Sequence, residues 1–287
     1  MASIINTNLL SLNAQTNTSM SQASLAKSIQ RLSSGLRVNT AADDAAGLSI
    51  STRMDAQVRG MTVAIRNSND GISLAQTADG ALSKVSDSLQ RMRELAVQAR
   101  NATNTSADKG SLDNEFGQLA QEIQRVLGGT TFNGEAIIGS DAGTQTFQVG
   151  ANTTSNDSID IATTDLTQDG DITAVAGTDN TGTGRATIDG TQTFAQIGTV
   201  IDNIDTAINT INTQRGTMGA AQNRFDSVVA NLNISVENQS AAKSRITDAD
   251  FAAETANLSR AQILQQAGTA MIAQANQLPQ QVLTLLR

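Results

Sequence analysis

Few residues of this chain belong to the types that do chemistry. The 287 residues include no His and no Cys, which removes the commonest general base, thiol nucleophiles, disulfides and the usual ligands of zinc, haem and iron–sulfur clusters. Carboxylates remain: Asp169 and Asp171 flank a Gly, and Asp179 precedes an Asn, as at the start of a calcium loop. The closing Glu of an EF-hand is absent, so acidic turn chemistry is the better interpretation.

Three further patterns also fail as chemical sites. Gly182 and Gly184 begin a Gly-x-Gly motif without the third Gly or the strand–helix context of a nucleotide site. Asp43 and Asp44 are adjacent, and adjacent helical residues do not face each other, so helix-start acids or an interface contact are favoured over a catalytic pair. The charged stretch 90–100, "QRMRELAVQAR", is by physics alone a solvated helix face. We therefore predict no enzyme activity, no cofactor and no metal.

The composition indicates long helices. Apolar residues make up 39% of the chain, aromatic residues 2%, and there is one Pro, where about 5% Pro is usual. Such a composition suits uninterrupted helices with narrow apolar seams. The net charge of −8 argues against nucleic-acid binding, which needs basic patches.

Heptad spacing predicts where the long helices lie. Alternating steps of four and three residues from 197 to 236 meet ten apolar residues in twelve positions, the spacing of a coiled-coil seam. A second helix covers 58–99, and after the turn formers of 101–110 a third follows and ends at the glycines 128–129. Within the segment 197–236, we predict that Ile204, Ile211, Phe225 and Leu232 form the apolar seam of an inner domain, here called the inner seam.

Two other segments depart from the helical period. Phe147 with Val149, and Ile159 with Ile161, alternate with polar residues and predict a β-hairpin near 144–162. Residues 165–195 are rich in Gly, Thr and Asp, and we predict an exposed insert with at most a short irregular strand pair.

Both ends of the chain lack charge, since 1–26 and 261–286 contain no Asp, Glu, Lys or Arg. Neither is apolar enough for a membrane span, and the first lacks the basic region and apolar core of a signal peptide. Each has an apolar stripe and an amide or hydroxyl face, which is far cheaper to bury than charge. We therefore predict helices enclosed by many copies in an assembly. The stripe residues are Ile5, Leu9, Leu12, Leu264, Met271, Leu278, Val282 and Leu285.

Four long motifs resemble bacterial flagellin. They are "SSGLRVNTAADDAAGLSIS" at 33–51, "QRMRELAVQAR" at 90–100, "FNGEAI" at 132–137 and "SRAQILQQAGTAMIAQANQLPQQVLTLLR" at 259–287. The likeness covers about residues 1–165 and 195–287. Larger members of the family carry one or two outer domains where this chain has only its short insert.

The resemblance implies a mainly α fold of long antiparallel helices, with a coiled-coil terminal domain and a helical-bundle inner domain that bears the β-hairpin. Residues 1–42 and 255–287 would form the two halves of the terminal domain. The inner domain would take 43–164 and 196–254, with 165–195 as a short variable surface insert.

The function implied by the resemblance is that of a structural subunit. It would self-assemble into the extracellular bacterial flagellar filament for swimming motility, and a type III export apparatus and an export chaperone would handle it without a cleaved signal peptide. Junction and cap proteins would be further partners, with no nucleic acid and no membrane. The alternative is the hook–filament junction protein, which shares the terminal helices. A zinc protease in the insert would need His-Glu-x-x-His, which a chain without His lacks, and a secreted adhesin is a third possibility.

The resemblance also implies that Toll-like receptor 5 recognises the monomer. The matching residues are Arg91, Leu95 and Glu115, which would also serve as a protofilament contact. Arg91 and Leu95 are four residues apart and so share a helix face. With Met92 and Ala96 facing inward, we expect Arg91 and Leu95 to point outward, with Glu115 on the adjacent antiparallel helix.

Overall fold

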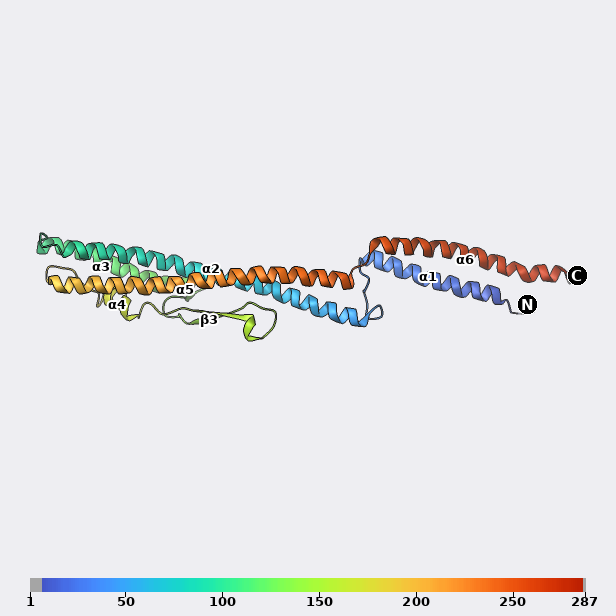
Figure 1. The fold of residues 1–287 in the computed structure, drawn as a ribbon, viewed down its shortest axis with the longest axis horizontal. Coiled ribbons are helices and arrows are strands. Elements are labelled where there is room, and N and C mark those ends of the chain that lie inside the picture. Colours follow the sequence, from blue (N-terminus) through green and yellow to red (C-terminus); the bar gives the residue numbers. More distant parts are fainter. Residues whose placement is uncertain (1–6, 286–287) are drawn as a thin grey trace. The chain divides into compact units, whose positions relative to one another are not determined.

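Six helices and two small two-stranded sheets make up the described part of the chain (Figure 1). The computed structural model describes the backbone of residues 7–285 and the side chains of residues 7–277. The helices are α1 (Leu9–Ser34), α2 (Ala45–Ala99), α3 (Ser106–Gly129), α4 (Gly170–Ala176), α5 (Phe194–Thr247) and α6 (Phe251–Leu285). This is the mainly α fold that the sequence predicts.

The chain divides into two compact units. One, here the terminal unit, comprises Met1–Gln57 and Glu237–Arg287; the other, the inner unit, is Val58–Val236. The division therefore lies inside the predicted boundaries at 42/43 and 254/255. α2 and α5 each run through a boundary without a break in the helix.

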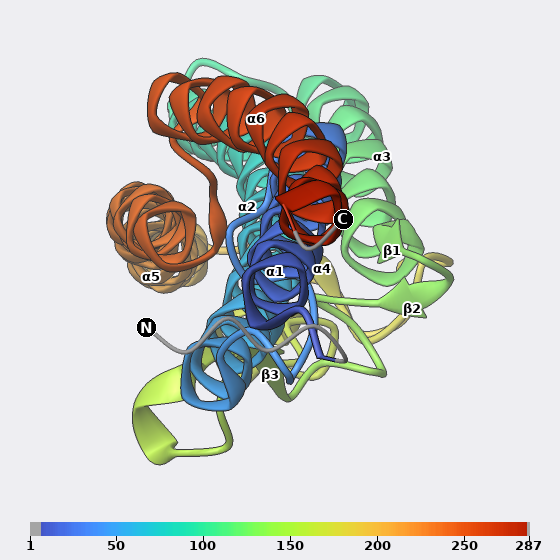
Figure 2. The ribbon, with the colours of Figure 1, turned by 90° about the vertical axis from the view of Figure 1, so that its right-hand side faces the viewer.

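The inner unit is built around α2, α3 and α5, and Figure 2 shows α3 and α5 on different sides of α2. Its core is made by the heptad positions, because steps of three and four residues keep one side of a helix facing its neighbour. Fully buried examples are Leu82, Leu89 and Met92 on α2, and Phe116 and Ile123 on α3.

Local sequence signals account for the ends of α3. Thr105 and Asp108 form a reciprocal capping box before its first turn, which satisfies backbone donors that a helix start leaves free. The helix ends at Gly129, as predicted. Strands β1 (Thr131–Phe132) and β2 (Glu135–Ala136) then pair across Asn133 and Gly134, whose φ angles of 51° and 91° suit the Asn-Gly turn of a tight hairpin.

The predicted β-hairpin is present. β3 (Thr144–Gln148) pairs antiparallel with β4 (Ser158–Ala162), with Phe147 opposite Ile159, and a 3₁₀ turn at Ser155–Asp157 lies between them. Asn67 of α2 donates to the Gln148 carbonyl at 3.0 Å, and the Phe147 ring meets Phe225 of α5 edge to face at 5.5 Å. The hairpin is thereby fixed to both long helices.

The prediction of an exposed insert at 165–195 is wrong for most of its large apolar residues, although Phe194 is 64% exposed. This segment contains α4, and its apolar side chains at 166, 172, 175, 176 and 188 are all buried. Arg185 pairs with Asp113 of α3 at 2.6 Å, and Asp113 also accepts from the Ile188 amide at 2.8 Å. Ile172, Val175 and Ala176 have helical spacing, but only over the seven residues of α4. Leu166 and Ile188 lie outside that helix, so no long periodic pattern predicts the burial of the segment from the sequence.

In the terminal unit, the two linkers between helices hold each other. Residues 35–44 lead from α1 to α2, and 248–250 lead from α5 to α6. The Arg37 amide donates to the Thr247 carbonyl at 2.7 Å, and the Ala249 amide donates to the Gly35 carbonyl at 2.9 Å. Gly35 adopts φ 72° at the end of α1, a left-handed conformation that costs glycine little.

Candidate functional site

The α1–α6 pair of the terminal unit has a seam of small residues. On α1 the buried side chains are Ser11, Thr18 and Ser28, and on α6 Ala261 and Ala275 are buried. The steps are seven and ten residues on α1 and fourteen on α6, each a sum of alternating three- and four-residue heptad steps, so they line one side of each helix. Small residues let two helix backbones approach closely, as they do in tightly packed helix pairs.

The closest approach in this seam is at Gly268 of α6. A Cβ atom on Gly268 would lie 2.4 Å from Thr18 Oγ1, well inside van der Waals contact. Thr18 Oγ1 donates to the Ala14 carbonyl of its own helix at 2.8 Å, so its hydroxyl is satisfied although the side chain is 6% exposed.

The free end of the pair is closed by polar side chains. Asn8 caps α1 by accepting from the Ser11 amide at 3.1 Å and donates through Nδ2 to the Ala275 carbonyl of α6 at 2.7 Å. Ser11 Oγ donates to Asn276 Oδ1 at 2.8 Å. Together with Thr18 beside Gly268, these contacts make α1 and α6 antiparallel neighbours, as Figure 1 also shows.

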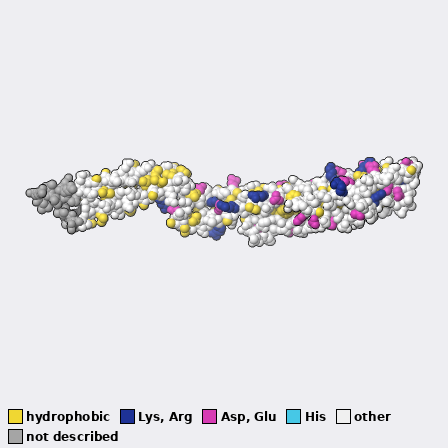
Figure 3. Space-filling model, turned by 180° about the vertical axis from the view of Figure 1, so that it is seen from behind, with side chains coloured by type: hydrophobic (Ala, Val, Ile, Leu, Met, Phe, Trp, Pro, Cys, Tyr) yellow, Lys and Arg dark blue, Asp and Glu magenta, His cyan; other side chains and the backbone are white. Residues whose placement is uncertain are grey.

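Several large apolar side chains of the pair are exposed. Leu9, Leu12, Leu264 and Met271 are 61%, 57%, 51% and 62% exposed. Figure 3 shows apolar side chains on this pair and the charged side chains gathered mainly over the rest of the visible face. Other large apolar residues of the terminal unit with exposed side chains are Leu10, Met20, Ile29, Ile50, Phe251 and Ile263.

These positions bear directly on the predicted stripe. The stripe on α1 and α6 is not what joins the two helices, because the Ser, Thr, Ala and Gly seam does. Leu9, Leu12 and Met271 are turned outward, where they are available to other molecules, and Leu264 lines the groove between α1 and α6 with about half of its side chain exposed. Ile5 lies outside the described residues, and so do the side chains of Leu278, Val282 and Leu285.

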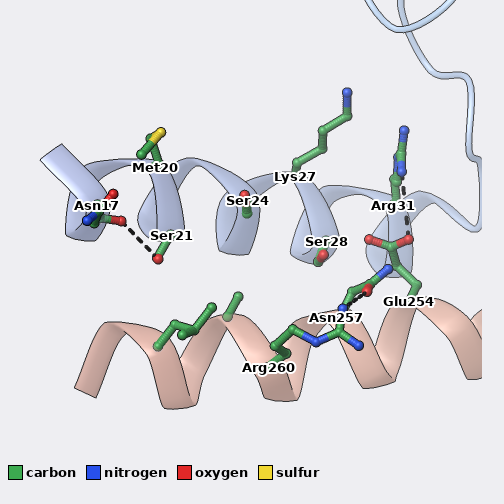
Figure 4. A pocket seen from close by; sticks show the side chains of 12 residues that line it. Asn17, Met20, Ser21, Ser24, Lys27, Ser28, Arg31, Glu254, Asn257 and Arg260 are labelled. Atoms are coloured by element: carbon green, nitrogen blue, oxygen red, sulfur yellow. Dashed lines mark hydrogen bonds and ion pairs between the residues drawn. The ribbon is translucent and has the colours of Figure 1, made fainter. Parts of the chain in front are cut away.

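A groove of about 660 Å³ lies where the charge-free part of the pair meets its first charges (Figure 4). Ser28 of α1 points across it toward α6, whereas Lys27 points away. Arg31 reaches Glu254 of α6 at 3.7 Å, and Lys27 pairs with Asp43 at 3.1 Å. The hydrogen bond from Lys27, followed by those from Thr40, lowers the pKa of Asp43 to about 2. At this end, one ion pair therefore joins α1 to α6, and a second joins α1 to the linker 35–44.

The predicted receptor residues lie in the inner unit, and two of them are in contact. Arg91 of α2 donates through Nε to Glu115 Oε1 of α3 at 2.9 Å, and through Nη1 to Glu94 Oε2 at 2.9 Å. Hydrogen bonds to Glu94 and Glu115 raise the pKa of Arg91 above its usual value. All three side chains are about half exposed or more.

Leu95 does not point outward as predicted, since it is 1% exposed. It lies with Met92 and Ala96 in the core. α2 packs against more than one element here, so its buried face is wider than the single heptad stripe on which the prediction relied. The predicted apolar plug of the receptor site is therefore part of the inner core.

The inner seam is placed largely as predicted. Ile204, Ile211 and Phe225 are fully buried on α5, and Leu232 is partly buried. The Phe225 ring sits over Gly71 of α2, where a Cβ would lie 2.7 Å from its Cζ. This seam positions the outer faces of α2 and α5.

The acids that resembled chemical sites cap helices and turns. Asp169 caps α4 through the Asp171 amide at 3.0 Å, and Asp179 accepts from the Thr181 amide at 2.9 Å. Asp44 caps the start of α2 through the Gly47 amide at 2.8 Å. Among the residues described, no group of three or more His, Cys, Asp or Glu could hold a metal ion. In the same part of the chain, no helix is long and apolar enough to cross a membrane.

The small seam residues are what the sequence reasoning missed. Their signal is a recurrence of Ser, Thr, Ala or Gly every seven residues, as at Ser11 and Thr18 or at Ala261, Gly268 and Ala275. Such a recurrence is invisible to a search for apolar residues.

Comparison with known proteins matches both halves of the chain to one family. The bacterial flagellin N-terminal helical region matches residues 5–142, and the bacterial flagellin C-terminal helical region matches 201–286. The flagellin of Halalkalibacterium halodurans is 46% identical over 99% of this chain and 100% of that protein. The flagellin of Serratia marcescens is 43% identical over the full length of both, and that of Bacillus subtilis is 40% identical over 99% of each. A crystal structure of Bacillus cereus flagellin is 34% identical and covers 58% of this chain and 88% of that one, with a TM-score of 0.48.

Proposed function

The chain belongs to the bacterial flagellin family, and on that premise we propose that it self-assembles into a flagellar filament through the outer face of its α1–α6 pair. Flagellins are structural proteins of the extracellular flagellar filament, and this chain is not an enzyme. The relatives reported above are named flagellins, which gives the junction-protein alternative no support.

The observation that carries the proposal is that α1 and α6 bury small residues between them and leave large apolar side chains exposed. Its seam is small and partly hydroxylated, while Leu9, Leu12, Leu264 and Met271 are more than half exposed. Full burial of one such side chain contributes about 1.5–3 kcal/mol. An exposed apolar face of this kind marks an interaction surface, and only other copies offer a matching one along the whole pair.

The absence of charge makes that face fit for burial on every side. From the start of α1 to Ala26, and from Ala261 to the end of α6, the polar side chains are amides and hydroxyls. Such groups can be buried if they find hydrogen-bond partners, whereas each unpaired charge costs several kcal/mol. The face is therefore suited to the interior of a polymer.

The test replaces one outward residue without touching the groove or the seam between α1 and α6. Met271→Asp should leave the helical content and thermal unfolding of the monomer unchanged, because the Met271 side chain is 62% exposed and does not line the groove. It should prevent filament formation, scored by negative-stain electron microscopy and sedimentation. Val97→Asp is the control, since Val97 is also more than half exposed, at 51%, but lies in the inner unit. Normal filaments from Met271→Asp would refute the proposed role of the pair.

We further propose that the monomer is recognised by Toll-like receptor 5 at the Arg91–Glu115 pair, with Leu95 supporting it from the core. The exposed ion pair joins α2 to α3 and offers donors and acceptors on one surface. In a receptor reporter assay, Arg91→Ala should lower signalling at least tenfold, the size of a small hot spot. Arg125→Ala, which breaks an exposed pair within α3, should signal like the wild type. Equal signalling by all three proteins would exclude Arg91.

The remaining expected partners stay proposals of the same kind. An export chaperone would cover the outward apolar residues of α6 before assembly, and the type III export apparatus, the junction proteins and the cap proteins would act at the ends of the process. Pull-down of the chaperone by wild type but not by Met271→Asp would support the first of these.

A further inference from the structure

Two exposed helix faces of the inner unit each combine an apolar residue with an unpaired charge, and the charges have opposite signs. On α2, Val63 is 48% exposed and the exposed Arg66 has no hydrogen bond or ion pair with any described residue. On α5, Ile234 is 60% exposed, and the exposed Asp226 is likewise without a partner among residues 7–285. Most other charges in this unit are paired or cap a helix or turn.

The residues of each face lie on one side of their helix. Arg59, Val63, Arg66 and Asp70 are spaced by four, three and four residues, and all four are exposed. Asp226, Ala230 and Ile234 are spaced by four and four, and all three are exposed. Residues three and four apart are surface neighbours on a helix. We call these sets the α2 face and the α5 face.

The two faces of one molecule cannot meet each other. The opposite side of α2 is buried at Ala64 and Ser68. α5 packs toward it through Phe225, whose ring covers Gly71. Because the helices meet through these buried sides, both exposed faces turn away from the contact. Only a second copy can bring an α5 face to an α2 face.

We propose that the α2 face of one copy binds the α5 face of a neighbouring copy, with Arg66 paired to Asp226 and Val63 packed against Ile234. This inference rests on the proposed function and names one lateral contact of the polymer. The contact joins two different surfaces, and a contact of that kind repeats into an open helical assembly unless its rotation closes a ring.

Charge complementarity is the reason to prefer a second copy over another occupant. The inner unit has eleven Lys and Arg against twenty Asp and Glu, so packed copies repel one another overall. A contact between copies is favoured where a positive face meets a negative face, because the two then attract each other. Opposite charges across an interface also fix its register. The α2 face has Arg59 and Arg66 against one acid, Asp70, so its charge is positive, and the α5 face supplies Asp226, which has no partner among residues 7–285.

Charge reversal tests the contact in both directions. Purified Arg66→Glu and Asp226→Arg should each raise the critical concentration for assembly at least about tenfold, because like charges would then meet. An equimolar mixture of the two variants should assemble like the wild type, since each variant supplies the partner that the other needs. The double variant should recover for the same reason. Filaments are scored by light scattering and negative-stain electron microscopy, and monomer folding by circular dichroism.

Matched controls lie on the same helices. Arg53→Glu on α2 and Asp202→Arg on α5 reverse exposed charges away from the two faces and should assemble normally. If the wild type assembles and either single variant does too, the inference is overturned while the proposed function stands. It is also overturned if both singles fail and neither the mixture nor the double variant recovers. If the wild type forms no filament, both proposals fall.

Discussion

Gly71 and Gly80 on α2 differ in what a methyl group would meet. At Gly71 a Cβ would lie 2.7 Å from the Phe225 ring, which is fully buried and cannot swing away; at Gly80 nothing lies within 4 Å. Ala favours a helix interior over Gly by about 0.5–1 kcal/mol. Where space is absent, overpacking costs about 1–3 kcal/mol and outweighs that gain.

The same substitution should therefore have opposite effects at these two positions. We expect Gly80→Ala to raise the free energy of unfolding of the inner unit and Gly71→Ala to lower it, as measured by urea unfolding of the monomer. Gly71→Ala should also disturb the edge-to-face contact of Phe225 with Phe147. Two equally stabilised variants would mean that the ring yields and that the seam is loosely packed here.

Single residues also show where sequence reasoning reaches its limit. The spacing of Phe225 predicts a place in the seam, and the residue is buried, because a large apolar side chain at a heptad position has few other places to go. A single apolar stripe on α2 predicts that Leu95 points outward, yet α2 buries a broader face that includes Leu95. Spacing identifies which residues share a side, but the number of neighbours around a helix decides how wide the buried side is.

At the scale of the elements, one ion pair attaches the segment after β4 to α3. Arg185 and Asp113 have side chains that are 19% and 11% exposed, and hydrogen bonding to Asp113 raises the pKa of Arg185. Gln124 of α3 also donates to the Gly177 carbonyl. These bonds attach residues 177–193, which contain few apolar residues and no helix or strand, to α3.

Removing the Arg should release this segment and little else. We expect Arg185→Met to raise amide hydrogen exchange across 177–193, first at Ile188, whose amide donates to Asp113. A hydrogen bond to a charged group contributes about 1.5–3 kcal/mol, so local opening should become at least about tenfold more frequent. Arg125→Met serves as the control, because its pair with Glu122 stays within α3. Unchanged exchange would show that apolar contacts alone hold the segment.

The elements differ in how far the sequence predicts them. α5 and the β3–β4 hairpin could be predicted because their buried residues are apolar and periodic. The α1–α6 seam could not, since its buried Ser11 and Thr18 carry no hydropathy signal and the apolar residues of those helices face outward. The docking of 165–193 was hidden for a different reason: its bonds to α3 join residues far apart in the sequence.

On the scale of the whole molecule, acid stability depends on carboxylates that serve as caps. A hydrogen bond from Lys27 lowers the pKa of Asp43 to about 2, and bonds from Thr105 and Thr191 lower the pKa values of Asp108 and Asp189. A lowered pKa in the folded state stabilises the fold above the unfolded value of about 3.9, and this contribution is lost as pH falls through the folded value. With no His in the chain, no side chain with an ordinary pKa titrates between pH 5 and 8.

We therefore expect the monomer's thermal midpoint to be level from pH 8 to about pH 5 and to fall steadily below about pH 4. Asp43→Asn should melt earlier than the wild type at pH 7, and the two curves should converge near pH 2. Asp202→Asn, which removes an exposed carboxylate with no partner among the described residues, should follow the wild type throughout. A gap between Asp43→Asn and the wild type that persists at pH 2 would show that the carboxylate's charge is not what matters.

The small seam of α1 and α6 leaves their alignment underdetermined. Thr18 faces Gly268. If α1 slid along α6 by one heptad, Thr18 would face Ala275 and Leu25 would face Gly268. Each larger side chain would then still lie opposite a small residue. Such a slide displaces one helix along the other by about 10.5 Å and leaves no cavity between them. What forbids it lies at the two ends: Asn8 on Ala275, Arg31 on Glu254, and the linkers joined at Gly35 and Ala249. The repeating seam therefore permits more than one alignment of the two helices, and the contacts at its ends select one of them.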